Sequence, residues 1–207
     1  MSSRTTSRRS FVSVAASVLA APFIGLAGNV SSVSGTGKPT RTGKPNRKPL
    51  VLPLVDPSII VTKSKRILRL YSGGKLVREY RAGLGSSPVE DKIKAGDRRT
   101  PEGEFYICRK NAQSKFYLSL ELSYPNRRHA DRGLRDGLIS RSQHNQILSA
   151  LEHKRVPLQN THLGGEIFIH GNGSSSDWTW GCVALEDKDI RELFDAIPVG
   201  TPVTIEH

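Results

Sequence analysis

Cysteine, methionine and aromatic residues are scarce in this chain. Its 207 residues include two cysteines, one methionine and two tryptophans, and Phe, Trp and Tyr together make up 6%. Structural zinc sites use four Cys or His ligands at close spacing, and neither a Cys-x-x-Cys nor a His-x-x-x-His pair lies near Cys182. The sequence therefore predicts no metal site, and none of its motifs calls for a cofactor.

Acidic residues are absent from residues 1–49, which contain eight lysines and arginines. The formal net charge of the whole chain is +12, so this segment holds most of the excess and residues 50–207 carry only about +4. These later residues show no basic stripe with interleaved aromatic side chains, which nucleic-acid-binding modules present. We therefore expect no nucleic-acid partner.

The N-terminus has the pattern of an export signal. Arg8 and Arg9 precede a weakly apolar run at residues 12–27, which is rich in small residues up to a possible cleavage site after Ala27. This order is typical of twin-arginine signals. An amphipathic or membrane-spanning helix is the alternative, but the run is short of the ~20 apolar residues that spanning needs and contains Pro22. Residues 1–27 are therefore predicted to direct export by the twin-arginine machinery, to the periplasm or cell wall.

Residues 28–56 are predicted to form a flexible basic linker, because they are rich in Ser, Gly, Thr, Pro and Lys and poor in residues to bury. Their positive charges either solvate the segment or attract it to an anionic surface, such as cell-wall polymer or lipid head groups. The folded domain is then expected at residues 57–207, a length that suits one domain.

Strand signals dominate the first half of that domain. Residues 58–70 and 75–84 read as a hairpin around the turn at Gly73 and Gly74, and shorter strands are predicted at residues 104–109 and 116–122. Further strands are expected at residues 167–169 and near the C-terminus.

Two segments have helical spacing. Ser140 and Gln143 resemble a capping box that begins an amphipathic helix ending before Pro157, and we expect it to pack over the sheet near the site. A second helix is predicted between Glu186 and Pro198. The fold class is therefore mainly β with two or three helices.

The stretch at residues 165–185 is the candidate catalytic site. His170 ends an apolar strand, a loop rich in Gly and Ser follows, and Gly181 precedes Cys182. A histidine beside a thiol can take its proton and create a nucleophilic thiolate. A disulfide with Cys108 would consume this nucleophile, and Cys108 reads as a buried strand side chain, so we expect two free thiols.

Four motifs in this order resemble the L,D-transpeptidase catalytic domain, also called the YkuD domain, over residues 57–206. They are Lys-Ala-Gly-Asp at residues 94–97 with Thr-Pro-Glu-Gly at 100–103, Ser-Tyr-Pro-Asn at 123–126, Ile-His-Gly at 169–171 and Gly-Cys at 181–182. The resemblance implies a β-sandwich-like fold that acts on peptidoglycan outside the cytoplasmic membrane, with Cys182 as nucleophile and His170 as its base.

Neighbouring residues receive supporting roles. The backbone N–H groups of Gly181 and Trp180, with that of Cys182, are expected to hold the reaction oxyanion. Substrate-binding or orienting roles are predicted for Thr179, Gly171 and Tyr124. The family commonly has Ser-His-Gly-Cys where this chain has Thr-Trp-Gly-Cys at residues 179–182, and Arg or Asn where it has Ala184. These departures, with the Tyr-Pro-Asn segment, resemble the YafK-like branch.

The expected reaction is release of D-Ala from a peptidoglycan stem tetrapeptide through a cysteine thioester, followed by transfer to an amine. The acceptor is left open: a second stem peptide, a lipoprotein or other protein lysine, or a D-amino acid. Hydrolysis of stem-peptide or lipoprotein–peptidoglycan bonds by the same fold is the first alternative. A non-catalytic module that only binds cell wall is the second.

Overall fold

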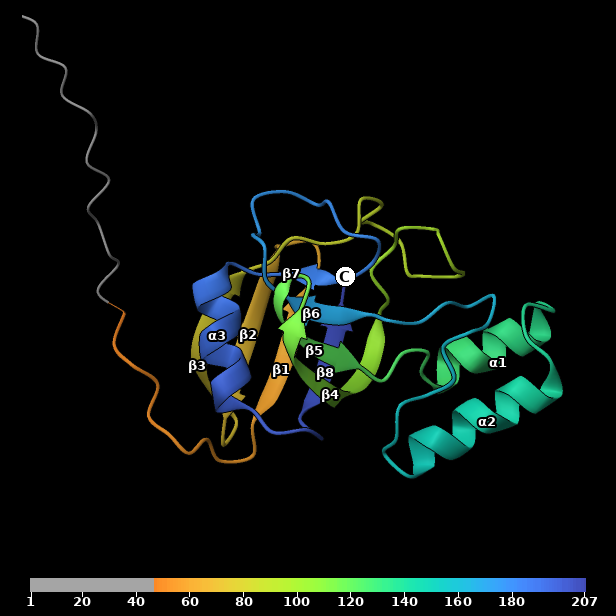
Figure 1. Ribbon diagram of the computed structural model, residues 1–207, viewed down its shortest axis with the longest axis horizontal. Coiled ribbons are helices and arrows are strands. Elements are labelled where there is room, and N and C mark those ends of the chain that lie inside the picture. The colour runs from red at the N-terminus through yellow and green to blue at the C-terminus, as the bar shows by residue number, and fades with distance from the viewer. Residues whose placement is uncertain (1–46) are drawn as a thin grey trace, which may run out of the picture. The chain divides into compact units, whose positions relative to one another are not determined.

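A computed structural model describes residues 47–207 (Figure 1). The predicted export signal and residues 28–46 of the predicted linker lie outside the described residues. Within the described part, no helix is both long and apolar enough to cross a membrane.

The described chain contains eight strands and three helices. In chain order they are β1 (Ser58–Thr62), β2 (Ile67–Ser72), β3 (Lys75–Arg81), β4 (Gly103–Ser114), β5 (Tyr117–Leu122), α1 (Arg127–Arg135), α2 (Arg141–Glu152), β6 (Phe168–His170), β7 (Val183–Ala184), α3 (Asp187–Ala196) and β8 (Pro202–Glu206). The predicted mainly β class with two or three helices is confirmed.

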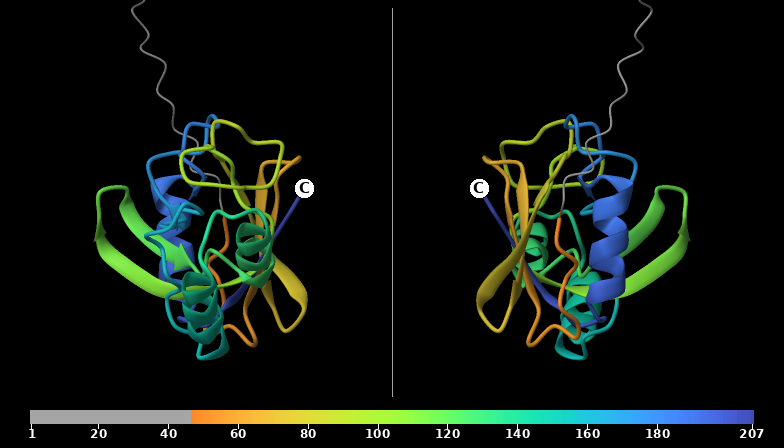
Figure 2. Two further views of the ribbon diagram at one scale, coloured as in Figure 1. Left: turned by 90° about the vertical axis from the view of Figure 1, so that its right-hand side faces the viewer. Right: turned by 90° about the vertical axis from the view of Figure 1, so that its left-hand side faces the viewer.

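The strands form one curled sheet in the order β3-β2-β1-β8-β4-β5-β6-β7. The β1–β8 and β6–β7 pairs are parallel, and the other pairs are antiparallel. The curl follows from β4, which pairs with β8 through its first residues and with β5 through the rest. Figure 2 shows the β2–β3 and β4–β5 hairpins on opposite sides of the molecule. Apolar side chains from both halves and from α3 fill one core between them.

The strand predicted at residues 58–70 is two strands, β1 and β2, joined by a turn at residues 63–66. Arg66 adopts a left-handed φ of 55° there. Lys63 turns inward, is 1% exposed, and donates from Nζ to the carbonyls of Val89 and Glu90 and to Glu102 Oε1 at 2.7 Å. The turn contains neither Gly nor Pro, so the sequence carried no turn signal.

The segment at residues 127–160 contains two helices where one was predicted. The side chain of Asn126 accepts from the His129 N–H at the start of α1, and Ser140 forms the predicted capping box of α2. The two helices share a small core with Leu163 that is separate from the sheet core, and they lie beside the sheet (Figure 1). The expectation that α2 packs over the sheet near the site is therefore wrong.

Residues 47–56, predicted as the end of the linker, lie against the domain. Arg47 pairs with Asp189 of α3 at 2.7 Å, and Leu50 and Leu54 pack against the core. The Gly73 N–H donates to the carbonyl of Val55 at 2.5 Å.

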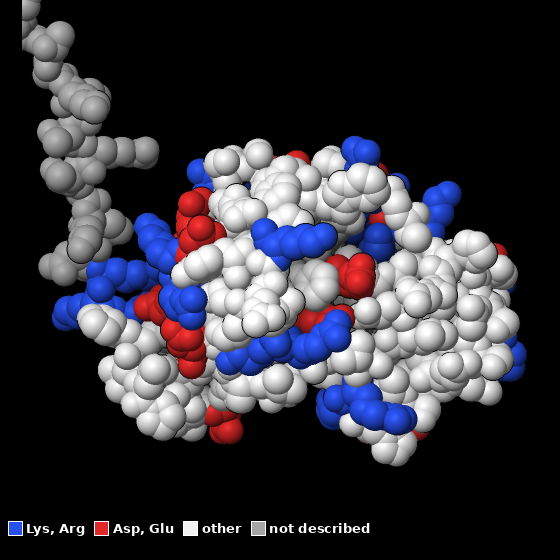
Figure 3. All heavy atoms as spheres, viewed as in Figure 1, with Lys and Arg blue, Asp and Glu red and all other residues white. Residues whose placement is uncertain are grey.

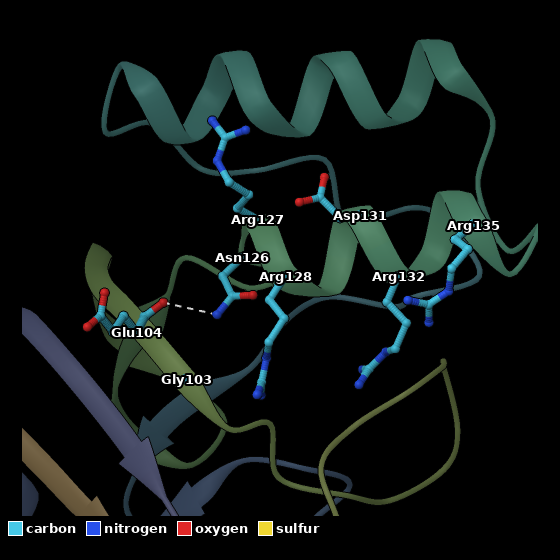
Figure 4. Close-up of a pocket in the computed structure, with 8 residues that line it drawn as sticks. All are labelled: Gly103, Glu104, Asn126, Arg127, Arg128, Asp131, Arg132 and Arg135. Carbon is cyan, nitrogen blue, oxygen red and sulfur yellow. Dashed lines mark hydrogen bonds between the residues drawn. The ribbon is translucent and has the colours of Figure 1, made fainter.

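A hollow of about 730 Å³ lies beside α1, and half of the residues that line it are arginines of that helix (Figure 4). Two of these, Arg128 and Arg132, reach Asp91 Oδ2 at 3.1 and 2.9 Å. Asp91 Oδ1 accepts from the Glu102 N–H at 2.8 Å and lies 3.1 Å from His129 Nε2. Although burial raises the pKa of Asp91, these hydrogen bonds and charges hold it well below its usual range. Asp91 therefore fastens the loop before β4 to α1.

We expect Asp91→Asn to lower the free energy of unfolding by about 3 kcal/mol at neutral pH, because it leaves the partly buried guanidinium of Arg132 without its counter-charge. Because the pKa of Asp91 is lower in the folded than in the unfolded protein, its ionised carboxylate stabilises the fold at pH values above the unfolded pKa. The difference in unfolding free energy between wild type and Asp91→Asn should therefore shrink as the pH falls below about 4. Urea unfolding at about pH 7 and about pH 3.5 measures both effects.

Asp136→Asn is the matched control, because Asp136, at the C-cap of α1, forms an exposed ion pair with Arg135. An exposed pair contributes about 0–1 kcal/mol, so this variant should unfold near the wild-type midpoint. Equal losses in the two variants would contradict the role given to Asp91.

Candidate active site

Parallel pairing of β6 and β7 brings His170 and Cys182 to the same face of the sheet. Ile169 pairs with Val183, and both side chains are 0% exposed in the sheet core. Because successive side chains of a strand point to opposite faces, those of His170 and Cys182 lie on the face away from this core. The register therefore places the two residues that the sequence nominated on one face of the sheet.

The ring of His170 is held in one orientation. Its Nδ1 lies 2.7 Å from the carbonyl oxygen of Gly171, which can only accept, so Nδ1 carries the proton and Nε2 of the neutral ring keeps its lone pair. Phe116 stacks on the imidazole at 4.5 Å between ring centroids, and Trp178 meets it edge-on at 5.5 Å. Burial lowers the pKa of His170, partly opposed by the Gly171 carbonyl. The imidazole is therefore a neutral base near pH 7.

Cys182 is half-buried and its thiol is held by backbone groups of the strand beside it. Sγ donates to the carbonyl of Glu166 at 3.6 Å and accepts from the Phe168 N–H at 3.5 Å. Burial raises the pKa of the thiol to about 11, against the lowering effects of the Phe168 N–H and the Lys92 charge. Within residues 47–207 no hydrogen bond joins Cys182 to His170. The resting pair is therefore a neutral thiol and a neutral imidazole.

The turn before the thiol is fixed by Thr179 and Gly181. Gly181 has a φ of 129°, and a Cβ there would lie 2.7 Å from the carbonyl oxygen of Arg99. The Thr179 hydroxyl accepts from the Gly181 N–H at 3.1 Å and donates to the Cys182 carbonyl at 2.8 Å. Thr179 therefore orients the turn that presents Cys182.

This contact corrects the predicted oxyanion donors. The Gly181 N–H already has the Thr179 hydroxyl as its acceptor, so it is not a free donor. The N–H groups of Trp180 and Cys182 are the two backbone N–H groups at residues 180–182 that have no acceptor in the described part of the chain.

The other predicted residues divide into two groups. Gly171 orients His170 through its carbonyl, and a Cβ there would lie 2.8 Å from the Phe116 carbonyl oxygen. Tyr124, in contrast, is 0% exposed, and its hydroxyl donates to the Leu163 carbonyl at 3.1 Å. This burial rules out direct contact of the Tyr124 side chain with a ligand in this structure, and of the two predicted roles only the orienting one is left to it.

The loop at residues 92–99 supplies charge that the sequence did not assign to the site. Asp97 accepts from the N–H groups of Ile93, Lys94 and Arg99 at 2.7–3.1 Å. It also pairs at 2.8 Å with the buried ammonium of Lys92, whose charge favours the Cys182 thiolate. The Lys-Ala-Gly-Asp motif marked this loop, but its fold onto the thiol depends on contacts distant in sequence.

Other titrating groups have structural partners. Cys108 forms no disulfide, its thiol donates to the Glu121 carbonyl at 3.4 Å, and burial raises its pKa to about 12. His144 lies 2.6 Å from Asp131, and His153 contacts the Ser149 carbonyl. Residues 47–207 hold no group of three or more His, Cys, Asp or Glu side chains able to bind a metal ion. On the face in Figure 3, basic and acidic side chains lie interspersed.

A comparison with protein families identifies the family of this chain. The model of the L,D-transpeptidase catalytic domain, YkuD, matches residues 56–205. The chain belongs to the YkuD family. It therefore carries the catalytic domain of an enzyme family, and the family assignment made from the four sequence motifs is confirmed.

Three solved structures are similar to this chain at low sequence identity. Pgp2 of Campylobacter jejuni, titled a helical cell shape determining protein, is 24% identical with a TM-score of 0.48, over 73% of this chain and 47% of its own. Bd1075 of Bdellovibrio bacteriovorus is 23% identical with a TM-score of 0.45, over 73% and 48%. An L,D-transpeptidase of Mycobacterium smegmatis is 10% identical with a TM-score of 0.43, over 73% and 59%. The chain thus spans about half to two thirds of these proteins, and no curated protein matches.

We expect Thr179→Val to free the Gly181 N–H from its acceptor, because Val has the same shape without the hydroxyl. The amide of Gly181 should then exchange with solvent faster, and the free energy of unfolding should fall by about 1–3 kcal/mol. Hydrogen exchange followed by NMR reads the first effect directly. Thr179→Ser keeps the hydroxyl and should retain slow exchange. A Gly181 amide that stays protected in the Val variant would refute the contact.

Proposed function

We propose that this YkuD domain is a peptidoglycan L,D-transpeptidase that works through a thioester on Cys182. The observation that carries the proposal is the position of His170 on the same sheet face as Cys182, with Nδ1 committed to the Gly171 carbonyl and Nε2 left to accept a proton. The substrate is a stem tetrapeptide that ends in D-Ala. The family match supports the reaction class.

In the proposed first half-reaction, Nε2 of His170 takes the Cys182 proton as Sγ attacks the carbonyl carbon of the third stem residue. The oxyanion accepts hydrogen bonds from the N–H groups of Trp180 and Cys182, each worth about 3–4 kcal/mol in the transition state. The C–N bond to D-Ala then breaks, and the leaving amine takes the proton from His170. A tripeptide thioester on Cys182 and free D-Ala result.

In the second half-reaction an acceptor amine loses a proton to His170 and attacks the thioester carbonyl. The C–S bond breaks, and the departing Cys182 thiolate regains the proton. A second stem peptide as acceptor yields a cross-link, and water in its place yields a free tripeptide.

The neutral resting pair implies general-base catalysis in place of a preformed thiolate–imidazolium pair. The thiol must leave the Glu166 carbonyl before His170 receives its proton. Slow alkylation of the resting thiol is therefore compatible with an enzyme, and analysis of products separates an enzyme from a binding module.

Hydrolysis is the second candidate. Trp180 and Ala184 depart from the family pattern, and these departures resemble the YafK-like branch, which includes a member that detaches a lipoprotein from peptidoglycan. An enzyme of this kind would hydrolyse bonds within stem peptides or bonds between a lipoprotein and peptidoglycan. A domain that only binds cell wall is the third candidate.

The proposed substrate lies outside the cytoplasmic membrane. Export through the twin-arginine machinery to the periplasm or cell wall would bring the enzyme there, and we propose this route from residues 1–27. The possible amine acceptors include a lipoprotein lysine.

Incubation of the full chain with a disaccharide tetrapeptide, followed by mass spectrometry, tests this proposal. Wild type should release D-Ala and form a cross-linked dimer, while Cys182→Ala should form neither product. His170→Gln should reduce product formation by about 100-fold or more, because the base is lost. Tripeptide without dimer would favour the hydrolase, and unchanged substrate in every sample would favour the binding module.

The pH dependence tests the neutral pair. His170 must be unprotonated to accept the thiol proton, and its pKa is lowered from 6.5 by burial. We therefore expect kcat/KM to rise with pH through a midpoint below 6.5 and to stay level between about pH 7 and about pH 9. A further rise in that interval would mean that Cys182 must ionise first, which would contradict the general-base step.

A further inference from the structure

Trp180 and Arg98 form an exposed pair at the edge of the active site. The indole of Trp180, two residues before Cys182, is 69% exposed. The guanidinium carbon of Arg98 lies 4.9 Å from the centre of this ring, a cation–π contact. An exposed Trp at this place has no core to fill, so its contact with Arg98 is the interaction that the described structure gives it.

The backbone that carries Arg98 is tightly held against the turn of the nucleophile. Arg98 has a left-handed φ of 58°, and its carbonyl accepts from the Ser87 N–H at 3.1 Å. A Cβ on Gly85 would lie 2.1 Å from this carbonyl and 3.1 Å from the Cα of Gly181. The base of the Arg98 side chain is therefore fixed relative to Cys182.

The Arg98 guanidinium is unpaired within residues 47–207: no hydrogen bond or ion pair engages its five N–H donors. Neighbouring arginines differ, because Arg99 lies 3.7 Å from Glu90 and Arg132 pairs with Asp91. Stacking on a ring occupies the face of a guanidinium and leaves its edge open for a ligand. A planar fork with a fixed base suits an oxyanion that accepts two parallel hydrogen bonds, as a carboxylate does.

We propose that Arg98, oriented by the Trp180 indole, binds a carboxylate of the peptide substrate at the edge of the active site. This inference rests on the proposed function, in which the substrate is a stem tetrapeptide with a free C-terminal carboxylate one residue beyond the bond that reacts. It also gives a role to Trp180, the position where this chain departs from the family pattern.

The test compares tetrapeptides that differ only in charge, using the full chain. All three carry, as their third residue, an amino acid chosen for its side-chain carboxyl. One ends in a free carboxylate and the second in a C-terminal amide. The third has a free C-terminus but an amidated side-chain carboxyl. Wild type should prefer the first peptide over one of the amides in kcat/KM, and the disfavoured amide identifies which carboxylate Arg98 binds.

Arg98→Gln should abolish that preference. Loss of a charge-assisted contact should lower kcat/KM for the first peptide, which has both carboxylates free, about 10- to 100-fold. The kcat/KM for the disfavoured amide should stay within about 3-fold of its wild-type value. Arg98→Lys keeps the charge without the fork and should recover part of the preference. Trp180→Leu should also weaken it, since the guanidinium loses its support. Equal slowing of acid and amides, or a wild type without preference, would overturn the proposal.

Lys154→Gln is the matched control for loss of a charge. Lys154 also has a left-handed φ, of 52°, and its ammonium lies 4.7 Å from the ring centre of Tyr106, beside α2. This variant should keep the wild-type preference. A loss of preference here would show that net charge, and not the Arg98 contact, selects the acid.

Binding separates this inference from the proposed reaction. Calorimetry with the Cys182→Ala full chain gives dissociation constants for the three peptides without turnover, and Arg98→Gln in that background should weaken only the peptides that carry the recognised carboxylate. If the selective binding is found but wild type forms no product, the subsite stands and the reaction fails. If products form but binding and kcat/KM ignore the carboxylates, the reaction stands and the subsite fails.

Discussion

The site depends on the close packing of three backbone segments around Gly181. The carbonyl of Arg99 occupies the space where a Cβ of residue 181 would sit, and the Cα of Gly181 lies against Gly85. Gly85 in turn packs on the Arg98 carbonyl, and its N–H donates to Thr100 Oγ1 at 2.9 Å. Backbone atoms at such separations leave little freedom to the turn that carries Cys182. A rigid turn presents its free N–H groups at fixed positions, which oxyanion stabilisation requires.

Beside this turn, both the Cys182 thiol and the His170 imidazole are kept neutral by burial. Burial disfavours the thiolate of Cys182 and the imidazolium of His170 alike. The Lys92 ammonium, anchored by Asp97, acts the other way on the thiol. In the proposed reaction, the charges arise only when a proton moves between the two groups. Asp91 precedes the loop that carries Lys92 and Asp97, and its contacts with Arg128 and Arg132 fasten that loop to α1.

The sequence predicted the parts of the site that are local. His170 ends a short strand, and Gly181 precedes the thiol. Only the pairing of β6 with β7 is then needed to place His170 and Cys182 on one face of the sheet. The family motifs nominate the same two residues. The sequence did not predict that the Thr179 hydroxyl accepts from the Gly181 N–H two residues away, because that depends on the exact turn geometry. Nor could it predict that Phe116, distant in sequence, stacks on His170. The burial of the motif residue Tyr124 also depends on a distant segment, because its hydroxyl donates to the carbonyl of Leu163.

The fold followed the same division. Strand periodicity identified most of the sheet. The turn after β1 was not predicted, because it contains a buried Lys63 and neither of the usual turn residues, Gly and Pro. α1 escaped prediction because its sequence is mostly basic and polar, and it is stabilised by Asn126 at its N-cap and by packing of Ala130 and Gly133 on α2 and Leu163. Periodicity detects a helix from an apolar stripe, which this helix largely lacks.

The most direct test of the account is to trap the covalent intermediate. The full chain is mixed with a stem tetrapeptide, quenched with acid, digested and analysed by mass spectrometry. The account predicts a tripeptide acyl group on the peptide that contains Cys182, and none on the peptide that contains Cys108. An acyl group on another residue, or release of D-Ala with Cys182 unmodified at every time point, would contradict it.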